Sequence, residues 1–254
     1  MNKRAMTEKA SKIKEFFLQF IMPPKCAVCG KLLNINDGTL CGDCLGRWHD
    51  EKEKECERCT RCASLCTCNA KLNKTAIISY YSSCSMYESD FSKEIIASLK
   101  YKRQKCLIKF MANELMSNMY MIYGLKLDNC IIAYPPRSKS SLKKYGFDHA
   151  KMLANELGSL TGIPVFHGMR HKGSKEQKYL NYESRAKNAF ESFYIKNTAE
   201  ASEKLRGKTV ILIDDVITTG ATAICIAAFL HNCGAESVKF LSVAKTPSLS
   251  KRNL

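Results

Sequence analysis

The residues best suited to chemistry lie in one stretch, where an apolar run leads through two carboxylates into a glycine turn. It reads VILIDDVITTGATA and covers Val210 to Ala223. The run of β-branched residues and Leu from Val210 to Ile213 predicts a strand buried on both faces of a parallel sheet. Asp214 and Asp215 follow it, and ligands of open α/β sheets bind at this carboxyl end of the strands. We therefore expect both acids to face a ligand.

The turn after the acids is suited to an anion. A helix is expected over residues 223–232, closed by Gly234, and the first turn of a helix offers free N–H groups and a positive dipole end. Gly220 allows a close backbone approach, and donors are added by the hydroxyls of Thr218, Thr219 and Thr222. A ribose with a 5-phosphate suits this arrangement, its hydroxyls on the acids and its phosphate on the turn. The alternative is an ordinary parallel strand ending in Asp.

Cysteines form a second group of candidate ligands. Nine of the 14 cysteines lie between Cys26 and Cys68. Two C-x-x-C pairs separated by a short predicted hairpin (Gly30 to Leu40) can close a tetrahedral zinc site: Cys26, Cys29, Cys41 and Cys44. This spacing predicts a structural zinc ribbon.

A second zinc site is expected further along the cysteine-rich segment. Cys56 and Cys59 form another C-x-x-C pair, and we expect Cys66 and Cys68 to complete the site. Cys62 is then a spare ligand or a free thiol. Buried cysteines acting as small hydrophobes are the alternative, but the many charged neighbours leave little apolar core for them. Core packing is expected for the isolated cysteines, Cys84, Cys106, Cys130, Cys225 and Cys233.

The remaining pattern predicts a larger α/β domain. A polar linker over 69–74 precedes an expected strand over 75–81, helices over 92–99 and 106–123, and a strand over 130–134. A basic patch between the two helices is either a polyanion contact or a solvated turn: Lys100, Tyr101, Lys102, Arg103 and Lys105. The predicted organisation is an amphipathic helix and lead-in (1–24), a double zinc ribbon (25–70) and an α/β domain (75–250).

The motifs resemble known families. The segment D-D-x-x-T-T-G-A-T is similar to the signature of type I phosphoribosyltransferases, whose ligand is 5-phosphoribosyl 1-pyrophosphate (PRPP). The whole chain from Phe16 onward resembles the ComF family, through the cysteines and through Pro136, Lys143 to His149, Gln177, Leu180, Arg185 and Asn188. Members of that family couple a zinc-binding segment to a phosphoribosyltransferase-like domain and are associated with competence for DNA uptake.

The resemblance implies a parallel, doubly wound α/β fold and a set of site residues. It implies that PRPP binds with Mg²⁺ to Asp214, Asp215 and the turn Thr218, Thr219, Gly220, Ala221 and Thr222, the two acids being catalytic if the protein is an enzyme. Further loop candidates are Lys143, Lys144, Gly146, His149 and Arg185. The segment 170–190 corresponds to a mobile hood in related transferases, and is either such a lid or a plain surface loop.

One loop departs from the family pattern. The family usually shows Arg-x-Arg-Gly-Phe-Asn-Gln, whereas this chain ends that loop in Asp148 and His149. An ionised Asp148 can only accept hydrogen bonds, and His149 changes charge near neutral pH, so recognition through this loop is in doubt. His149 is either a general acid or base or, more commonly for a lone His at a helix start, a structural residue.

Composition limits the functional classes. The formal net charge of +16 favours polyanionic partners, although a basic solvated surface has the same composition. No apolar run approaches the ~20 residues of a membrane span, and no cleavable signal is evident, so a reducing cytoplasm is expected. Two hypotheses follow. One is a ComF-like protein that binds PRPP and single-stranded DNA, with uptake-machinery proteins as possible partners. The other is an active phosphoribosyltransferase in nucleotide salvage or a related transfer to a nitrogen acceptor.

Overall fold

The structure is a computed structural model that describes residues 23–34, 38–57, 59–66, 68, 78–123, 127–172 and 190–246. Several predicted features lie outside these residues. They are the amphipathic helix before residue 23, most of the ribbon hairpin tip, the linker over 69–74, and Gln177, Leu180, Arg185 and Asn188 of the expected hood.

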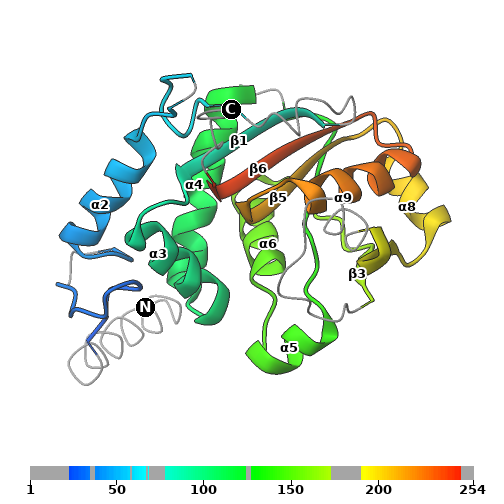
Figure 1. The fold of residues 1–254 in the computed structure, drawn as a ribbon. Helices are drawn as coiled ribbons and strands as arrows, with labels where there is room; N and C mark the ends of the chain where they lie inside the picture. The colour runs from blue at the N-terminus through cyan, green and yellow to red at the C-terminus, as the bar shows by residue number, and fades with distance from the viewer. Residues whose placement is uncertain are drawn as a thin grey trace, which may run out of the picture.

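A four-stranded parallel sheet forms the centre of the fold (Figure 1). Its order is β1 (Ile78–Met86), β6 (Ser237–Lys245), β5 (Thr209–Ile217) and β2 (Cys130–Ala133). Every pair in it is parallel, and the bridge from Ile132 to Val165 continues the pairing beyond β2. The predicted parallel α/β architecture is confirmed.

Helices cover both faces of this sheet. One face packs against α3 (Asp90–Tyr101), α4 (Lys105–Tyr123) and α6 (His149–Thr161), and the other against α8 (Thr198–Leu205) and α9 (Ala221–Asn232). Strand β5 contributes to both layers, because Ile211 and Ile213 join the first core while Val210 and Leu212 join the second. All four side chains are fully buried, which explains the continuous apolar run.

Three short elements lie outside the main sheet. Helix α5 (Lys139–Tyr145) lies between β2 and α6 in the chain. Strands β3 (Met169–His171) and β4 (Phe193–Ile195) form an antiparallel ribbon at the two ends of the expected hood segment.

Strand β1 differs from its prediction. The sequence indicated a strand ending at Tyr81, whereas β1 continues to Met86 through a serine-rich stretch. These serines are buried but satisfied: Ser82 Oγ donates to Ser64 O at 2.9 Å, Ser85 Oγ donates to Val243 O at 3.0 Å, and Ser83 hydrogen-bonds Ser242. The partners come from distant parts of the chain, so local strand propensity could not reveal the extension.

The cysteine-rich segment packs directly on the α/β core. Its helix α2 (Gly42–Glu53) places Trp48, which is fully buried, edge-on to Phe110 of α4 at 6.1 Å. Arg47 stacks over Phe91 of α3 at 4.4 Å, and Lys52 pairs with Glu114 at 2.6 Å. The first cysteine cluster therefore shares the core of the larger domain.

The second cysteine cluster packs against the carboxyl ends of strands β1 and β6. Met86, at the end of β1, packs with Cys56, Ala63 and Cys66. Lys245, the last residue of β6, is 3% exposed and its Nζ donates to the backbone oxygen of Cys66 at 2.9 Å. Among the described residues, no helix is both long and apolar enough to cross a bilayer.

Candidate phosphosugar site and cysteine clusters

The two acids lie within strand β5. The sequence placed them just after the strand, but β5 pairs with β6 as far as Ile217, opposite Lys245. Asp215 is 4% exposed and Asp214 is half-buried. Both line a cavity of about 390 Å³ near the carboxyl end of the sheet. Both acids therefore border a cavity at the end of the sheet where a ligand was expected.

Asp215 is held by two cationic or ionisable side chains. Its Oδ2 contacts His149 Nε2, and its Oδ1 lies 3.2 Å from Lys100 Nζ and accepts from Val216 N at 2.6 Å. Burial alone would raise the pKa of the Asp215 carboxyl, but His149 and Lys100 outweigh it and the pKa is lowered. Asp215 is thus ionised and already satisfied within the protein.

The pKa of the Asp214 carboxyl is shifted in the opposite direction. Burial, followed by the negative charge of Asp215, raises its pKa to about 8. Its Oδ1 accepts from Asp215 N at 2.8 Å. Close carboxylates whose pKa values are pushed apart are a frequent feature of functional sites. Asp214 is the acid with capacity left to accept a ligand hydroxyl.

We expect the raised pKa of Asp214 to appear in the stability of the protein. Its ordinary value is 3.8 and its folded value about 8, so between these values the folded chain retains a proton that the unfolded chain releases. Stability then falls as pH rises through this window. Asp214→Asn removes this term and keeps an amide oxygen for Asp215 N. Its thermal midpoint in magnesium-free buffer should fall less steeply from pH 5 to 8 than that of the unsubstituted protein; identical slopes would contradict the assignment.

His149 is a structural partner of the acid pair. It begins α6, is 8% exposed, and has one ring nitrogen on Asp215. Its other nitrogen, Nδ1, is buried without a partner among the described residues. The lone-histidine alternative, a structural role, is the one that the contacts support. Sequence spacing could not show this, because 66 residues separate His149 from Asp215.

Asp148 fits its position better than the departure from the family pattern suggested. It is the N-cap of α6, and its Oδ1 accepts from Lys151 N at 3.1 Å. Its Oδ2 accepts from Arg137 N at 2.9 Å. Both contacts need an acceptor, so a carboxylate can replace an amide here without loss.

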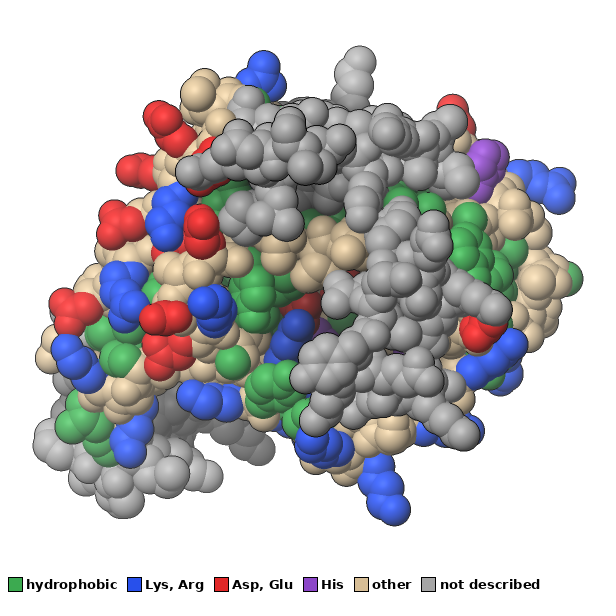
Figure 2. Space-filling view, viewed as in Figure 1, with side chains coloured by type: hydrophobic (Ala, Val, Ile, Leu, Met, Phe, Trp, Pro, Cys, Tyr) green, Lys and Arg blue, Asp and Glu red, His purple; other side chains and the backbone are tan. Residues whose placement is uncertain are grey.

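Aromatic and basic side chains surround the cavity. Tyr101 and Tyr145 lie with ring centroids 5.0 Å apart, and Arg137 stacks on Tyr145 at 4.9 Å. Tyr101 is 53% exposed. In Figure 2 a recess opens at the centre of the view, where acidic, basic and histidine side chains meet. The lining residues include Lys100, Tyr101, Pro135, Pro136, Arg137, Ser138, Tyr145, His149, Phe193, Asp214 and Asp215.

The predicted anion turn has the expected backbone. Gly220 adopts a left-handed conformation with φ 76° and is the N-cap of α9, which begins at Ala221, two residues earlier than predicted. Gly220 has no side chain to cap the helix, and Thr219 Oγ1 accepts from Ala221 N at 3.4 Å. Thr218 is exposed, while Thr219 and Thr222 are half-buried. None of residues 218–222 lines the 390 Å³ cavity, which ends at the acids.

The other loop candidates lie around this cavity and do not line it. Lys143 and Lys144 are exposed on α5, and Gly146 ends that helix with φ 74°. Arg185 lies outside the described residues. Lys100 was expected in a surface patch, yet its side chain is only 30% exposed because it turns onto Asp215. Its role was not identifiable from sequence, since 115 positions separate the partners.

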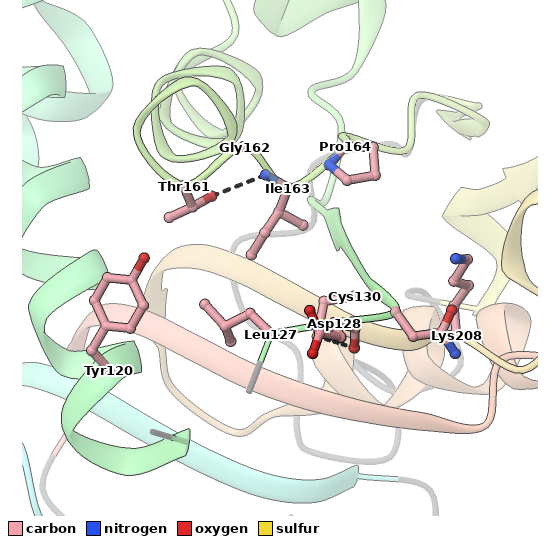
Figure 3. Close-up of a pocket in the computed structure, with 10 residues that line it drawn as sticks. Tyr120, Leu127, Asp128, Cys130, Thr161, Gly162, Ile163, Pro164 and Lys208 are labelled. Atoms are coloured by element: carbon pink, nitrogen blue, oxygen red, sulfur yellow. Dashed lines mark hydrogen bonds between the residues drawn. The ribbon is translucent and has the colours of Figure 1, made fainter. Parts of the chain in front are cut away.

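A second hollow lies at the opposite end of the sheet, where strands β2 and β5 begin (Figure 3). It has about 430 Å³ and is lined by residues near the starts of β2 and β5, among them Asp128, Cys130 and Lys208. Parallel sheets bind ligands at the carboxyl ends of their strands. The hollow in Figure 3 is therefore a useful control region for tests of the acid site.

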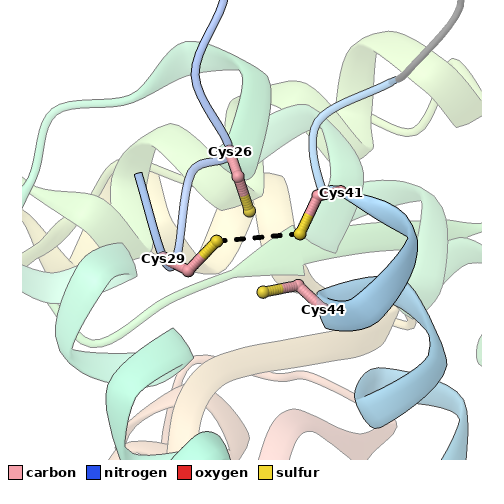
Figure 4. A group of neighbouring side chains, drawn as sticks. All are labelled: Cys26, Cys29, Cys41 and Cys44. Atoms are coloured by element: carbon pink, nitrogen blue, oxygen red, sulfur yellow. Dashed lines mark hydrogen bonds between the residues drawn. The ribbon is translucent and has the colours of Figure 1, made fainter. Parts of the chain in front are cut away.

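The first cysteine cluster has the geometry of a metal site (Figure 4). Cys26, Cys29, Cys41 and Cys44 point toward one another, with Sγ atoms all within 4.8 Å. Cys41 and Cys44 lie at the start of α2 rather than in a second ribbon turn. Burial alone would raise the pKa of the Cys26 thiol. Backbone hydrogen bonds at Cys41 and Val28 outweigh this effect and lower the pKa to about 6. A thiolate ready to bind zinc is the result.

The second cluster consists of the four cysteines that the spacing indicated. The Sγ atoms of Cys56, Cys59, Cys66 and Cys68 also lie within 4.8 Å of one another. Cys62 is outside this group, with its Sγ 3.3 Å from Ser64 Oγ. The two clusters fit a zinc-ribbon-like module with two tetrahedral thiolate sites.

Comparisons with known proteins agree with this geometry. A family model described as phosphoribosyl transferase domain matches residues 142–253. Competence protein F of Haemophilus influenzae is 23% identical over 87% of this chain and 96% of its own length. The DNA utilization protein YhgH of Salmonella typhimurium is 24% identical over 89% of this chain and 98% of its own. The chain is thus homologous to proteins named competence protein F and DNA utilization protein YhgH, and its residues 142–253 match a phosphoribosyltransferase domain.

The chain is similar to further proteins. Competence protein ComFC of Streptococcus pneumoniae is 22% identical over 87% of this chain and 100% of its own length. Among solved structures, adenine phosphoribosyltransferase from Saccharomyces cerevisiae is 15% identical, with a TM-score of 0.39 over 56% of this chain and 70% of that chain. The allosteric regulatory enzyme of purine biosynthesis is 16% identical, with a TM-score of 0.38 over 58% of this chain and 30% of that chain.

Proposed function

We propose that this ComF homologue binds PRPP together with Mg²⁺ and binds single-stranded DNA, and that it acts in the cytoplasm in DNA uptake. The observation that carries PRPP binding is the position of Asp214 and Asp215. They line a cavity near the carboxyl end of β5, and the helix start at Gly220 follows them within a matched phosphoribosyltransferase domain.

Each part of the ligand has a suitable partner in the chain. The ribose hydroxyls are assigned to Asp214 and the 5-phosphate to the N–H groups of residues 219–222. Magnesium, when bound, neutralises part of the pyrophosphate charge, and carboxylate oxygens are the donors that it prefers. The thiolates of the two cysteine clusters hold structural zinc, and a reducing compartment keeps such thiols free of disulfides.

A calorimetric titration of the intact protein with PRPP, with and without Mg²⁺, tests the proposal. We expect saturable binding that weakens when Mg²⁺ is omitted. Repeating the titration with bound single-stranded DNA shows whether the two ligands occupy the protein together. Absence of PRPP binding in the presence of Mg²⁺ would refute the proposal.

An active transferase is the second candidate. The aromatic walls of the cavity, Tyr101, Tyr145 and Phe193, are suited to a planar acceptor such as a base. In such a reaction a nucleophilic nitrogen displaces pyrophosphate from C1 of PRPP, as in nucleotide salvage. Pyrophosphate release measured with a panel of bases separates this enzyme from a protein that binds PRPP without turnover.

Single-stranded DNA binding should be electrostatic with a stacking component. The net charge is +16, and in Figure 2 basic side chains gather at the lower edge of the view, where Figure 1 places α5. We expect the affinity for an oligonucleotide to fall at least about tenfold between about 50 and about 200 mM salt. Affinity independent of salt would contradict DNA binding of this kind.

Stacking is tested by a substitution. Tyr101→Ala should weaken oligonucleotide binding by about 1 to 3 kcal/mol through lost stacking, and Met121→Ala, an exposed control on α4, should have no effect.

A further inference from the structure

Lys100 occupies an unusual position for a lysine in a basic surface segment. It lies next to the last residue of α3, and its side chain turns inward until Nζ is 3.2 Å from Asp215 Oδ1. The same side chain lines the acid cavity and is 30% exposed. The ammonium therefore pairs with a buried acid and still borders the space that a ligand would enter.

Lys100 is the cation of this cavity with the freer side chain. Of the described lining residues, only Lys100 and Arg137 carry a permanent positive charge. The guanidinium of Arg137 is fixed by two hydrogen bonds to the backbone: its Nη1 donates to Phe147 O at 3.1 Å and its Nη2 to Lys100 O at 2.6 Å. A lysine ammonium has three donors on a flexible stem, and Asp215 uses one of them.

Asp215 does not depend on Lys100 alone. Val216 N and His149 Nε2 also contact its carboxylate. If the ammonium of Lys100 left, Asp215 would keep a backbone donor and the imidazole. The geometry thus permits Lys100 to change partners without leaving a buried carboxylate bare.

We propose that Lys100 is a ligand-operated binding residue, which pairs with Asp215 in the free protein and transfers its ammonium to the 1-pyrophosphate of PRPP. The inference rests on the proposed PRPP site. In PRPP the pyrophosphate is attached to C1, next to the 2-hydroxyl that Asp214 is assigned to bind, so it enters the same cavity. Lys100 then selects a sugar phosphate that carries pyrophosphate at C1 over one that lacks it.

A pair of ligands distinguishes this role from a purely structural one. Lys100→Met keeps the length of the side chain and removes the charge, and Lys102→Met, at an exposed position two residues later, is the matched control. For Lys100→Met we expect at least a tenfold loss of affinity for PRPP with Mg²⁺ and less than a threefold change for ribose 5-phosphate. Lys102→Met should leave both affinities unchanged. Equal losses for both ligands, or no loss for PRPP, would overturn the proposal.

A second measurement uses the unsubstituted protein, in case Lys100→Met fails to fold. Limited acetylation with mass spectrometry reports the reactivity of the Lys100 amine. We expect PRPP and inorganic pyrophosphate to protect it and ribose 5-phosphate to leave it reactive, with Lys102 unaffected by all three. Protection by ribose 5-phosphate equal to that by PRPP would overturn the proposal. Failure of the proposed function is separately recognisable, because the unsubstituted protein would then not bind PRPP at all.

Discussion

Removal of zinc is expected to unfold this protein, not only its cysteine-rich segment. Two bound zinc ions per chain are predicted, and structural zinc contributes about 10 to 16 kcal/mol of folding free energy in model peptides. Cys26, Cys41 and Cys44 belong to the same buried cluster as Trp48 and Phe91, so losing the first site opens the core shared with α3 and α4. A strong chelator should therefore abolish the cooperative thermal transition of the whole chain.

Matched cysteine variants locate this effect. Cys44→Ser, at a 2% exposed position, should reduce bound zinc to one ion per chain and lower the thermal midpoint sharply. Cys62→Ser should retain both ions, because Cys62 lies outside the second cluster. Zinc content is measured by a colorimetric chelator assay and stability by calorimetry. Equal zinc loss in the two variants, or a zinc-free protein with an unchanged transition, would contradict the assignment.

The two neighbouring acids should respond oppositely to the same substitution. Asp215→Asn deprives Lys100 and His149 of their shared carboxylate, which we expect to cost on the order of 2 kcal/mol of stability. This is less than the ~3 to 5 kcal/mol typical of fully buried pairs, because the Lys100 side chain is 30% exposed. Asp214→Asn should leave stability unchanged or raised near pH 8, because burial disfavours its charge.

Asp214 should matter for PRPP binding rather than for stability. At a pH above about 8, where Asp214 is ionised, Asp214→Asn should weaken PRPP binding at least tenfold, since a hydrogen bond to a charged acceptor contributes about 1.5 to 3 kcal/mol. The matched control is Asp128→Asn, an exposed acid in the hollow at the opposite end of the sheet, which should bind PRPP normally. Loss of stability in Asp214→Asn, with unchanged PRPP affinity, would show that the roles of the two acids are reversed or absent.

The sequence was sufficient for the features that depend on local patterns. The apolar run at Val210 to Ile213 predicted a strand buried on both faces, and Gly220 predicted the turn before α9. The choice of Cys66 and Cys68 over Cys62 agrees with the cluster geometry, because tetrahedral sites constrain the spacing of their ligands.

Long-range contacts were the limit of prediction. The partners of Asp215 come from α3 and from the start of α6, and only the packing of these helices on one face of the sheet brings Lys100 and His149 to the acid. For the same reason the serines of β1 gave no strand signal, although Ser242 and Val243 of β6 satisfy them in the core. Side-chain networks of this kind follow from tertiary structure and leave no periodic trace.

The central claim is that the acid pair and the turn at Gly220 together seat a phosphorylated sugar. A crystal structure of the protein soaked with PRPP and Mg²⁺ tests it most directly. We expect density for the 5-phosphate at the N–H groups of residues 219–222, with the ribose hydroxyls on Asp214. Density for the sugar at the hollow of Figure 3, with the acid cavity free of ligand, would contradict it.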